Sequence, residues 1–185
     1  MFELKPTKIP GCFELLPRVH KDIRGRFVKV FQKDFFKQNG LETCFSEEYY
    51  SFSHQGVIRG MHFQLPPCDH VKLVYCVSGE VLDVVFDLRK ESPTYGHFEV
   101  IKVNASMANC VYIPKGLAHG FYTSSQAIMV YNVSTVYSPH YDAGILWNSF
   151  GMVWPIADPI ISARDQSFPA FDVFDSPFSY KTMQL

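Results

Sequence analysis

Short runs in which apolar and polar positions alternate recur along most of this 185-residue chain, and this two-residue period predicts β-strands. Residues 71–88 are rich in β-branched and apolar side chains and are interrupted only at Ser78-Gly79, which predicts two strands joined by a tight turn. Further strands are predicted at residues 99–103, 110–113 and 128–137. Within the last strand, alternation places one set of side chains on a single face: Met129, Tyr131, Val133, Thr135 and Tyr137.

Turn signals separate these strands, and helical patterning is rare. Residues 92–96 and 114–116 contain the Pro and Gly residues that are typical of turns. The one clear helical stretch is residues 33–38, with Asn39-Gly40 as its stop signal. Many short strands between such turns indicate an all-β sandwich or barrel. With no repeat or linker, we expect one domain over residues 1–185, and a Pro- and Asp-rich tail from Pro155 that wraps the surface.

Composition supports a folded protein and excludes some partners. Hydrophobic residues make up 47% of the chain, which is sufficient to fill a core. Aromatic residues make up 16%, which suits strands most often and also the walls of sugar or nucleobase pockets. The formal net charge of −1 provides no general basic field for nucleic acid or an anionic membrane, so phosphate binding would require a few placed cations.

The cysteine pattern and the amino terminus predict a cytoplasmic location. The five cysteines are scattered and never form a CxxC pair, which favours reduced thiols over disulfides or structural zinc. Residues 1–16 contain no long apolar run, so we expect no signal peptide. No window approaches the roughly 20 apolar residues that a membrane helix needs.

Two of the seven histidines lie in unusual surroundings. His62 lies in the run RGMHFQ at residues 59–64, and His119 lies in IPKGLAHGF at residues 113–121. A lone histidine is more often a hydrogen-bonded structural residue than a catalyst. Arg59, His62 and Lys72, however, fall in one apolar, strand-rich region. If they point inward they must be paired or functional, because an unpaired buried charge is costly.

The Pro-x-Gly-x-x-His turn at residues 114–119 resembles a cupin motif, which raises the question of a metal site. Metal-binding cupins also have a His-x-His pair followed by a glutamate, whereas Phe63 and Gln64 follow His62 here. Lys72 lies where further ligands would be sought, and its ammonium group repels a metal ion. We therefore expect no metal.

A longer series of segments resembles the dTDP-4-dehydrorhamnose 3,5-epimerase family, in the family's order and over nearly the whole chain. These are residues 59–67 (RGMHFQLPP), 72–74 (KLV), 79–81 (GEV), 87–89 (DLR), 92–96 (SPTYG), 113–121 (IPKGLAHGF), 147–148 (WN), 154–155 (WP) and 161–165 (ISARD). The resemblance implies an all-β cupin or jelly-roll barrel with few short helices. It also implies a homodimer with an exchanged N-terminal strand, no cofactor, and a role in deoxysugar and surface polysaccharide biosynthesis.

The resemblance also implies a mechanism and a role for four residues. A 4-keto group acidifies the C–H bonds at C3 and C5, because the carbanion delocalises into an enolate. By the family motif His62 is the base, and Asp165 orients its imidazole. Lys72 stabilises the enolate oxygen, and Tyr131 returns a proton to the opposite face of the sugar. A base and an acid on opposite faces make inversion possible.

Substrate-binding positions follow from the same match. Arg59 corresponds to a position that binds the diphosphate, which suits the bidentate guanidinium group. His119, Tyr137 and Arg164 are expected in the pocket, and Tyr137 is expected on the strand face of Tyr131. Arg24 and Phe27 keep the family's N-terminal pattern, and we expect Phe27 to stack on a base bound by the partner subunit.

The nucleotide half of the site departs from the family pattern. Lys29 stands where the family usually has a glutamate that accepts the N3–H of thymine, and a lysine donor suits cytosine better. Glu47 and Tyr49 stand where a glutamine and an asparagine are usual, so Glu47 either turns away from the diphosphate or meets a different sugar. Four alternatives therefore remain: a dTDP-sugar 3,5-epimerase, an epimerase of a CDP-linked or other sugar or of one carbon only, a non-catalytic sugar-nucleotide-binding barrel, and a ketoisomerase.

Overall fold

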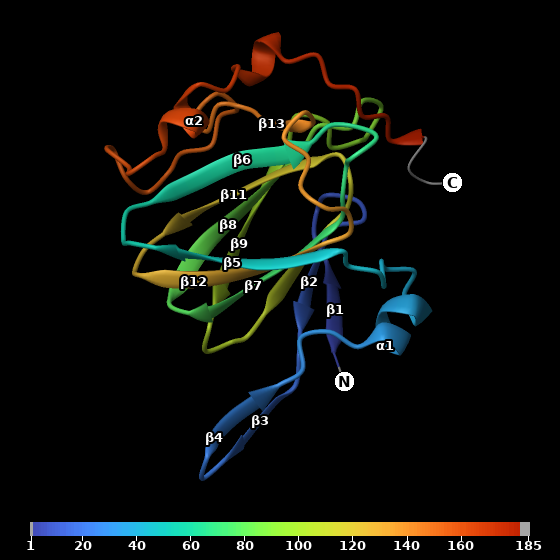
Figure 1. Cartoon of the computed structure of the whole chain (residues 1–185), viewed down its shortest axis with the longest axis vertical. Helices are drawn as coiled ribbons and strands as arrows, with labels where there is room; N and C mark the ends of the chain where they lie inside the picture. Colours follow the sequence, from blue (N-terminus) through green and yellow to red (C-terminus); the bar gives the residue numbers. More distant parts are fainter. Residues whose placement is uncertain (1, 182–185) are drawn as a thin grey trace.

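The computed structural model describes residues 2–181, which form two antiparallel sheets that face each other (Figure 1). The first sheet has the strand order β1-β2-β10-β7-β12-β5. Its strands are β1 (Glu3–Pro6), β2 (Phe13–Leu16), β5 (Glu47–Ser53), β7 (Lys72–Ser78), β10 (Cys110–Ile113) and β12 (Ala127–Val133).

The second sheet has the order β13-β6-β11-β8-β9. Its strands are β6 (Ile58–Gln64), β8 (Glu80–Asp87), β9 (Phe98–Asn104), β11 (Leu117–Thr123) and β13 (Asp142–Gly144). A separate hairpin of β3 (Val19–Asp22) and β4 (Gly25–Val28) projects away from both sheets (Figure 1). The protein has the jelly-roll fold of the cupin class that the sequence predicted.

The strand predictions at residues 71–88, 99–103 and 110–113 are confirmed, and so is the helix, α1 (Lys33–Gln38). The tight turn at Ser78-Gly79 does not join neighbouring strands, because β7 and β8 belong to opposite sheets. Gly79 has a φ of +78°, and a Cβ there would collide with the carbonyl of Gln126. Glycine therefore allows the chain to cross between the sheets at a point where no side chain fits.

The strand predicted at residues 128–137 is shorter than expected, and the placement of Thr135 and Tyr137 on it was wrong. β12 ends at Val133. The Ser134 amide donates to the carbonyl of Val71, and its hydroxyl accepts the Val71 N–H. Further on, the Ser138 amide donates to the Gln64 side chain at 2.6 Å. The Ser134–Val71 bonds continue the register of β12 with β7, and the Ser138–Gln64 bond then ties the chain to β6 of the other sheet.

The core lies at one end of the space between the sheets, which leaves the other end open. β12 directs Ala127 and Met129 into the apolar cluster, where Val74 and Cys76 of β7 also lie. Toward the other end the inward positions are polar, with Lys72 on β7 and Tyr131 on β12. The barrel is thus filled at one end and polar at the other.

The tail does more than wrap the surface, because it covers the outer face of the second sheet (Figure 1). Phe150, Trp154 and Phe178 are buried there against Phe86. The same tail carries α2 (Ala163–Gln166), next to β6, and a 3-10 turn, η1 (Phe171–Val173). Within residues 2–181, no helix has the length and apolar character needed to cross a bilayer.

Candidate active site

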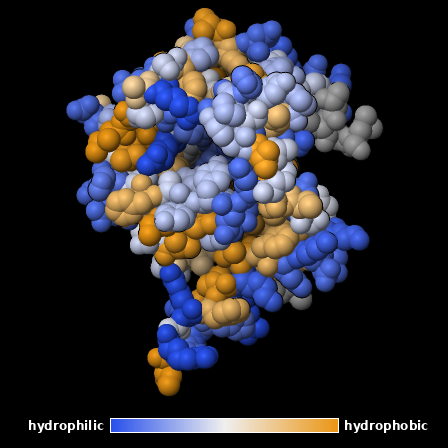
Figure 2. Space-filling view, viewed as in Figure 1, coloured by the Kyte–Doolittle hydropathy of each residue, from blue (hydrophilic) through white to orange (hydrophobic). Residues whose placement is uncertain are grey.

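A cavity of about 530 Å³ opens between the two sheets, where the surface in Figure 2 is hollowed. Both sheets contribute to its walls. The predicted residues that line it are Glu47, Arg59, His62, Lys72, His119, Tyr131, Tyr137 and Arg164. This volume suits a small-molecule ligand such as a sugar.

A bulge in β6 directs both Arg59 and His62 into this cavity, although they are three residues apart. His119 pairs with His62 and Phe121 pairs with Arg59, so Gly120 alone lies opposite two residues of β6. A Cβ on Gly60, whose φ is +146°, would lie 2.6 Å from the Gly120 Cα. The Gly60–Gly120 contact therefore permits the bulge that brings the two polar side chains to one face.

His62 contacts Asp165 as the resemblance implied, across 103 positions of sequence. Its Nε2 lies 2.8 Å from Asp165 Oδ1, and Asp165 Oδ2 accepts the Gly60 N–H at 3.0 Å. Ser162 caps α2 by accepting the Asp165 N–H, which fixes the buried carboxylate beneath β6. Burial acts to raise the pKa of Asp165, but the hydrogen bonds from His62 and Gly60 outweigh it and hold that pKa below its ordinary value.

The His62 imidazole has the protonation state that a base requires. Burial lowers the pKa of His62 below its ordinary value, although the Asp165 carboxylate acts in the opposite direction. The ring is therefore neutral at pH 7. The Nε2 proton faces Asp165, which leaves the lone pair of the other ring nitrogen, Nδ1, to accept a proton.

Lys72 is a buried cation at the same end of the barrel. Its ammonium donates to the His62 carbonyl at 3.1 Å, the one hydrogen bond it makes among residues 2–181. An ammonium has three N–H groups, so two remain for a ligand oxygen. Burial lowers the pKa of Lys72 to about 8, and the carboxylates of Asp83 and Asp142 act in the opposite direction. Lys72 thus stays mostly protonated at pH 7.

Tyr131 projects from the sheet that faces the His62 sheet. Its hydroxyl lies 2.9 Å from Ser51 Oγ, and its ring stacks on Tyr49 with centroids 4.8 Å apart. Burial raises the pKa of Tyr131 above its ordinary value, so the phenol is protonated at neutral pH and able to donate. Three neighbours, Ser51, Tyr49 and the edge of His119, hold the ring in place.

A second buried His–Asp pair lies beside the cavity, and its histidine lines the wall. His119 Nε2 lies 2.7 Å from Asp83 Oδ2, and both side chains are almost wholly buried. The other oxygen of Asp83, Oδ1, has no hydrogen-bond partner among the described residues. Asp83 does not line the cavity, so the pair presents His119 to a ligand, with its imidazole held by Asp83.

Charged side chains surround the mouth of the cavity. Arg59 donates from Nε to Ser53 Oγ at 2.9 Å and from Nη2 to the Phe52 carbonyl at 3.2 Å, which holds its guanidinium beside the opening. Glu47 lines the cavity and accepts the Tyr137 N–H at 3.0 Å. Tyr137 reaches the cavity from the segment after β12.

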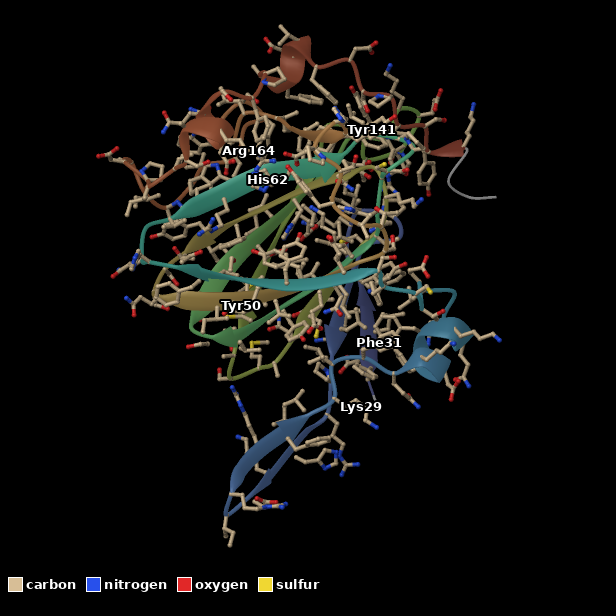
Figure 3. The ribbon with its side chains drawn as sticks, in the orientation of Figure 1. Lys29, Phe31, Tyr50, His62, Tyr141 and Arg164 are labelled. Carbon is tan, nitrogen blue, oxygen red and sulfur yellow. The ribbon has the colours of Figure 1, made fainter. Side chains whose placement is uncertain are left out.

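The structure does not bring the three N-terminal candidates to this cavity. Arg24 lies in the turn of the β3–β4 hairpin and pairs with Asp22 at 2.6 Å. Phe27 lies on β4 and is 63% exposed. Lys29 directly follows β4, at the base of the projecting hairpin (Figure 3). Within one chain, these residues are separate from the His62 site.

The sequence analysis did not assign several residues that the site contains: Tyr49, Ser51, Gln64, His70, Asp83 and Asp142. Tyr49 and Ser51 occupy alternate positions of β5 with Glu47, so strand alternation placed them on one face. Asp83 was detectable as a charge within the apolar run of residues 81–86. Asp142 carried no comparable signal, because β13, which it begins, has only three residues and shows no periodicity.

Comparisons with known proteins place the chain among sugar-nucleotide epimerases. A family profile described as dTDP-4-dehydrorhamnose 3,5-epimerase matches residues 6–172. A Shigella flexneri dTDP-4-dehydrorhamnose 3,5-epimerase is 40% identical over 175 residues, covering 91% of this chain and 97% of the relative. A Streptomyces niveus dTDP-4-dehydrorhamnose 3-epimerase is 36% identical over 167 residues, covering 88% and 81%. A solved Legionella pneumophila dTDP-6-deoxy-D-glucose-3,5-epimerase, in complex with dTDP-4-keto-L-rhamnose, is 29% identical with a TM-score of 0.92, covering 97% of this chain and 99% of that one.

Proposed function

The chain belongs to the dTDP-4-dehydrorhamnose 3,5-epimerase family, and on that premise we propose that it inverts both C3 and C5 of a dTDP-linked 4-keto-6-deoxyhexose. It is an isomerase that acts on a nucleotide-linked 4-keto sugar. The proposal adds the nucleotide, the number of carbons inverted and the role of each residue.

His62 begins the reaction in this proposal. Its neutral imidazole removes the proton from a carbon next to the ketone, and the Asp165 carboxylate stabilises the imidazolium that forms. Negative charge moves to the C4 oxygen as the enolate develops. The Lys72 ammonium, with two N–H groups to spare in a buried position, stabilises that oxygen.

Tyr131 completes the inversion. Its phenol donates a proton to the same carbon from the opposite face, and the enolate collapses to the ketone. Arg59 binds the diphosphate, and His119, held in place by Asp83, accepts a hydrogen bond from a sugar hydroxyl.

One observation carries the proposal: the base and the acid come from opposite sheets. His62 stands on β6 of one sheet and Tyr131 on β12 of the other, and both line the same cavity. A planar enolate bound between them is exposed to a base on one face and to an acid on the other. A single group that performed both steps would mostly restore the original configuration.

Solvent deuterium incorporation tests this function. In D2O, the enzyme is incubated with 4-keto-6-deoxyglucose linked either to dTDP or to CDP, and NMR follows C3, C5 and the configuration at each. We expect deuterium at both carbons of the dTDP sugar, together with the inverted product.

The other outcomes each contradict a defined part of the proposal. Turnover of the CDP sugar alone would contradict the choice of nucleotide, in the direction that Lys29 indicates. Exchange and inversion at only one carbon would contradict inversion of both centres and would identify the protein as a single-carbon epimerase. No exchange with either sugar, in folded protein that binds the ligand, would support the non-catalytic barrel.

We further propose that the protein acts as a homodimer in which the β3–β4 hairpin reaches the partner's cavity. The outer face of the first sheet is apolar and exposed, with Tyr50 72% exposed, Phe52 49% and Val77 47%. Tyr50, which Figure 3 labels, points away from the cavity because it alternates with Tyr49. Such a patch suits a second copy of the chain. The exposed Phe27 ring would then reach the partner's cavity and stack on the base of the nucleotide bound there.

Sedimentation equilibrium checks the dimer. The wild-type protein should have the mass of two chains, and replacing Tyr50 and Phe52 together by lysine should give a folded monomer, because burying two ammonium groups in the interface is costly. A Val153→Lys variant provides the control, since Val153 is 88% exposed outside this patch. A monomeric wild-type protein would contradict the proposal. The dimer and a cytoplasmic location, which the free thiols suit, both belong to the proposal.

A further inference from the structure

Arg164 forms an ion pair beside the base of the site. Its Nη2 donates to Asp142 Oδ2 at 2.5 Å, and its guanidinium lies over the Phe168 ring at 5.1 Å. The same Phe168 ring contacts His62 edge-on. Figure 3 shows Arg164 directly beside His62, with the two side chains coming from the tail and from β6. The pair thus places a fixed positive charge next to the imidazole.

The geometry separates the roles of Arg164 and Asp165 toward His62. Arg164 Nη1 lies 3.3 Å from His62 Nε2, and Asp165 Oδ1 lies 2.8 Å from the same atom. An Nε2–H that donates to Asp165 has no lone pair left to accept from Arg164. Arg164 therefore acts on the imidazole as a charge. Its Nη1 also lies 3.6 Å from Asp165 Oδ1, so it shares that carboxylate with His62.

The Arg164 guanidinium is already engaged by other groups of the protein. Arg164 is therefore poorly placed to bind a diphosphate. Asp142, Asp165 and the Phe168 ring hold it on the tail side of the cavity. Arg59, by contrast, is bound by a serine hydroxyl and a backbone carbonyl, both neutral, and keeps its full charge for a phosphate. The two arginines that the sequence analysis assigned to substrate binding are thus held in different ways.

We propose that Arg164 and Asp142 are positioning residues for His62 and Lys72: Arg164 places its positive charge beside the imidazole, and Asp142 partly neutralises that charge through their ion pair. This inference rests on the role of His62 as the base. A neutral imidazole is needed before proton abstraction, and the Arg164 charge adds to the burial that keeps it so. The Asp142 carboxylate balances that charge, which prevents Arg164 from making the base too weak or depriving Lys72 of its proton.

The charged groups around His62 and Lys72 come from several elements, and β7 is one of them, because Lys72 itself lowers the pKa of His62. α2 contributes Asp165 and Arg164, and β13 contributes Asp142. β8 contributes Asp83 through its pair with His119 of β11, which is in register with His62. The direction of the electrostatic effects agrees with the geometry, because Arg164 lowers the pKa of both His62 and Lys72, and Asp142 raises that of Lys72.

The pH profile of kcat/KM tests the inference. For the wild-type enzyme we expect an acid midpoint below 6.5, set by His62, and a basic midpoint near 8, set by Lys72. Arg164→Gln removes a positive charge and should move both midpoints up by about half a pH unit to one unit. Asp142→Asn removes a negative charge and should move both down by a similar amount. The double variant should restore values close to the wild type.

An NMR titration of the His62 ring protons in the free protein gives the same information without turnover. Its midpoint should rise in Arg164→Gln and fall in Asp142→Asn even if the substrate proves to be different. The matched control is Arg59→Gln, which should raise KM for the sugar nucleotide and leave the His62 midpoint unchanged. Unchanged His62 midpoints in both the Arg164 and the Asp142 variant would overturn the inference. An inactive wild-type protein with shifted midpoints would instead contradict the proposed function alone.

Discussion

Replacing His62 by asparagine should reduce kcat/KM by a factor of about 10²–10⁴ and abolish solvent exchange at both carbons of the sugar. Asparagine has no nitrogen that accepts a proton at neutral pH, and its amide is too short to reach the position from which the ring Nε2 contacts Asp165 at 2.8 Å. The loss of exchange therefore reports the missing base, and folding is checked separately. Deuterium incorporation followed by NMR measures it directly.

Binding and folding controls distinguish this loss from a general defect. His62 is partly exposed, with 26% of its side chain accessible, so the smaller asparagine leaves little buried volume unfilled. The variant should retain the circular dichroism of the wild type and its affinity for dTDP. Exchange that continues at the wild-type rate would show that another group, such as the His119–Asp83 pair, removes the proton.

Replacing Tyr131 by phenylalanine should separate exchange from inversion. The aromatic ring keeps its stack on Tyr49 and its contact with His119, and only the hydroxyl bonded to Ser51 is lost. His62 remains able to remove a proton and return deuterium from the same face. We therefore expect deuterium in recovered substrate of unchanged configuration, and a rate of inversion lower by about 10²-fold or more.

The comparison of the two rates in one NMR experiment makes this prediction specific. A structural defect would reduce exchange and inversion together, whereas loss of the acid alone reduces inversion. Ser51→Ala offers a milder companion, because it removes the partner of the phenol and keeps the phenol itself. Inversion near the wild-type rate in Tyr131→Phe would assign the acid role elsewhere, with the neighbouring Tyr49 as the first candidate.

Much of the fold was predictable, because its signals are local. Apolar and polar alternation identified β7, β8, β9 and β10, and Asn39-Gly40 marked the end of α1. The extent of β12 was not predictable in this way. The residues after Val133 keep a strand-like pattern, and only tertiary contacts, such as the hydrogen bond from the Ser138 amide to the Gln64 side chain, take them away from the sheet.

The sequence predicted which residues belong to the candidate site, but it did not predict how they are arranged in space. The motif match named His62, Lys72, Tyr131 and Asp165 without any distance between them. Tyr49 was noted only as a departure from the family, although its ring fixes that of Tyr131. Asp142 was not named, because its importance comes from Arg164, a residue 22 positions away in sequence.

The sequence by itself determined the all-β class, the positions of β7 to β10, the family and the reaction class. These follow from local periodicity and from residue types in a fixed order, which a linear chain displays fully. Only the tertiary structure decided which side chains line the same side of the cavity. The Gly60–Gly120 contact turns Arg59 and His62 to the same face, and the crossing at Gly79 places β7 and β8 in opposite sheets. Both depend on backbone segments far apart in sequence meeting at van der Waals distance, and side-chain periodicity carries no information about such contacts.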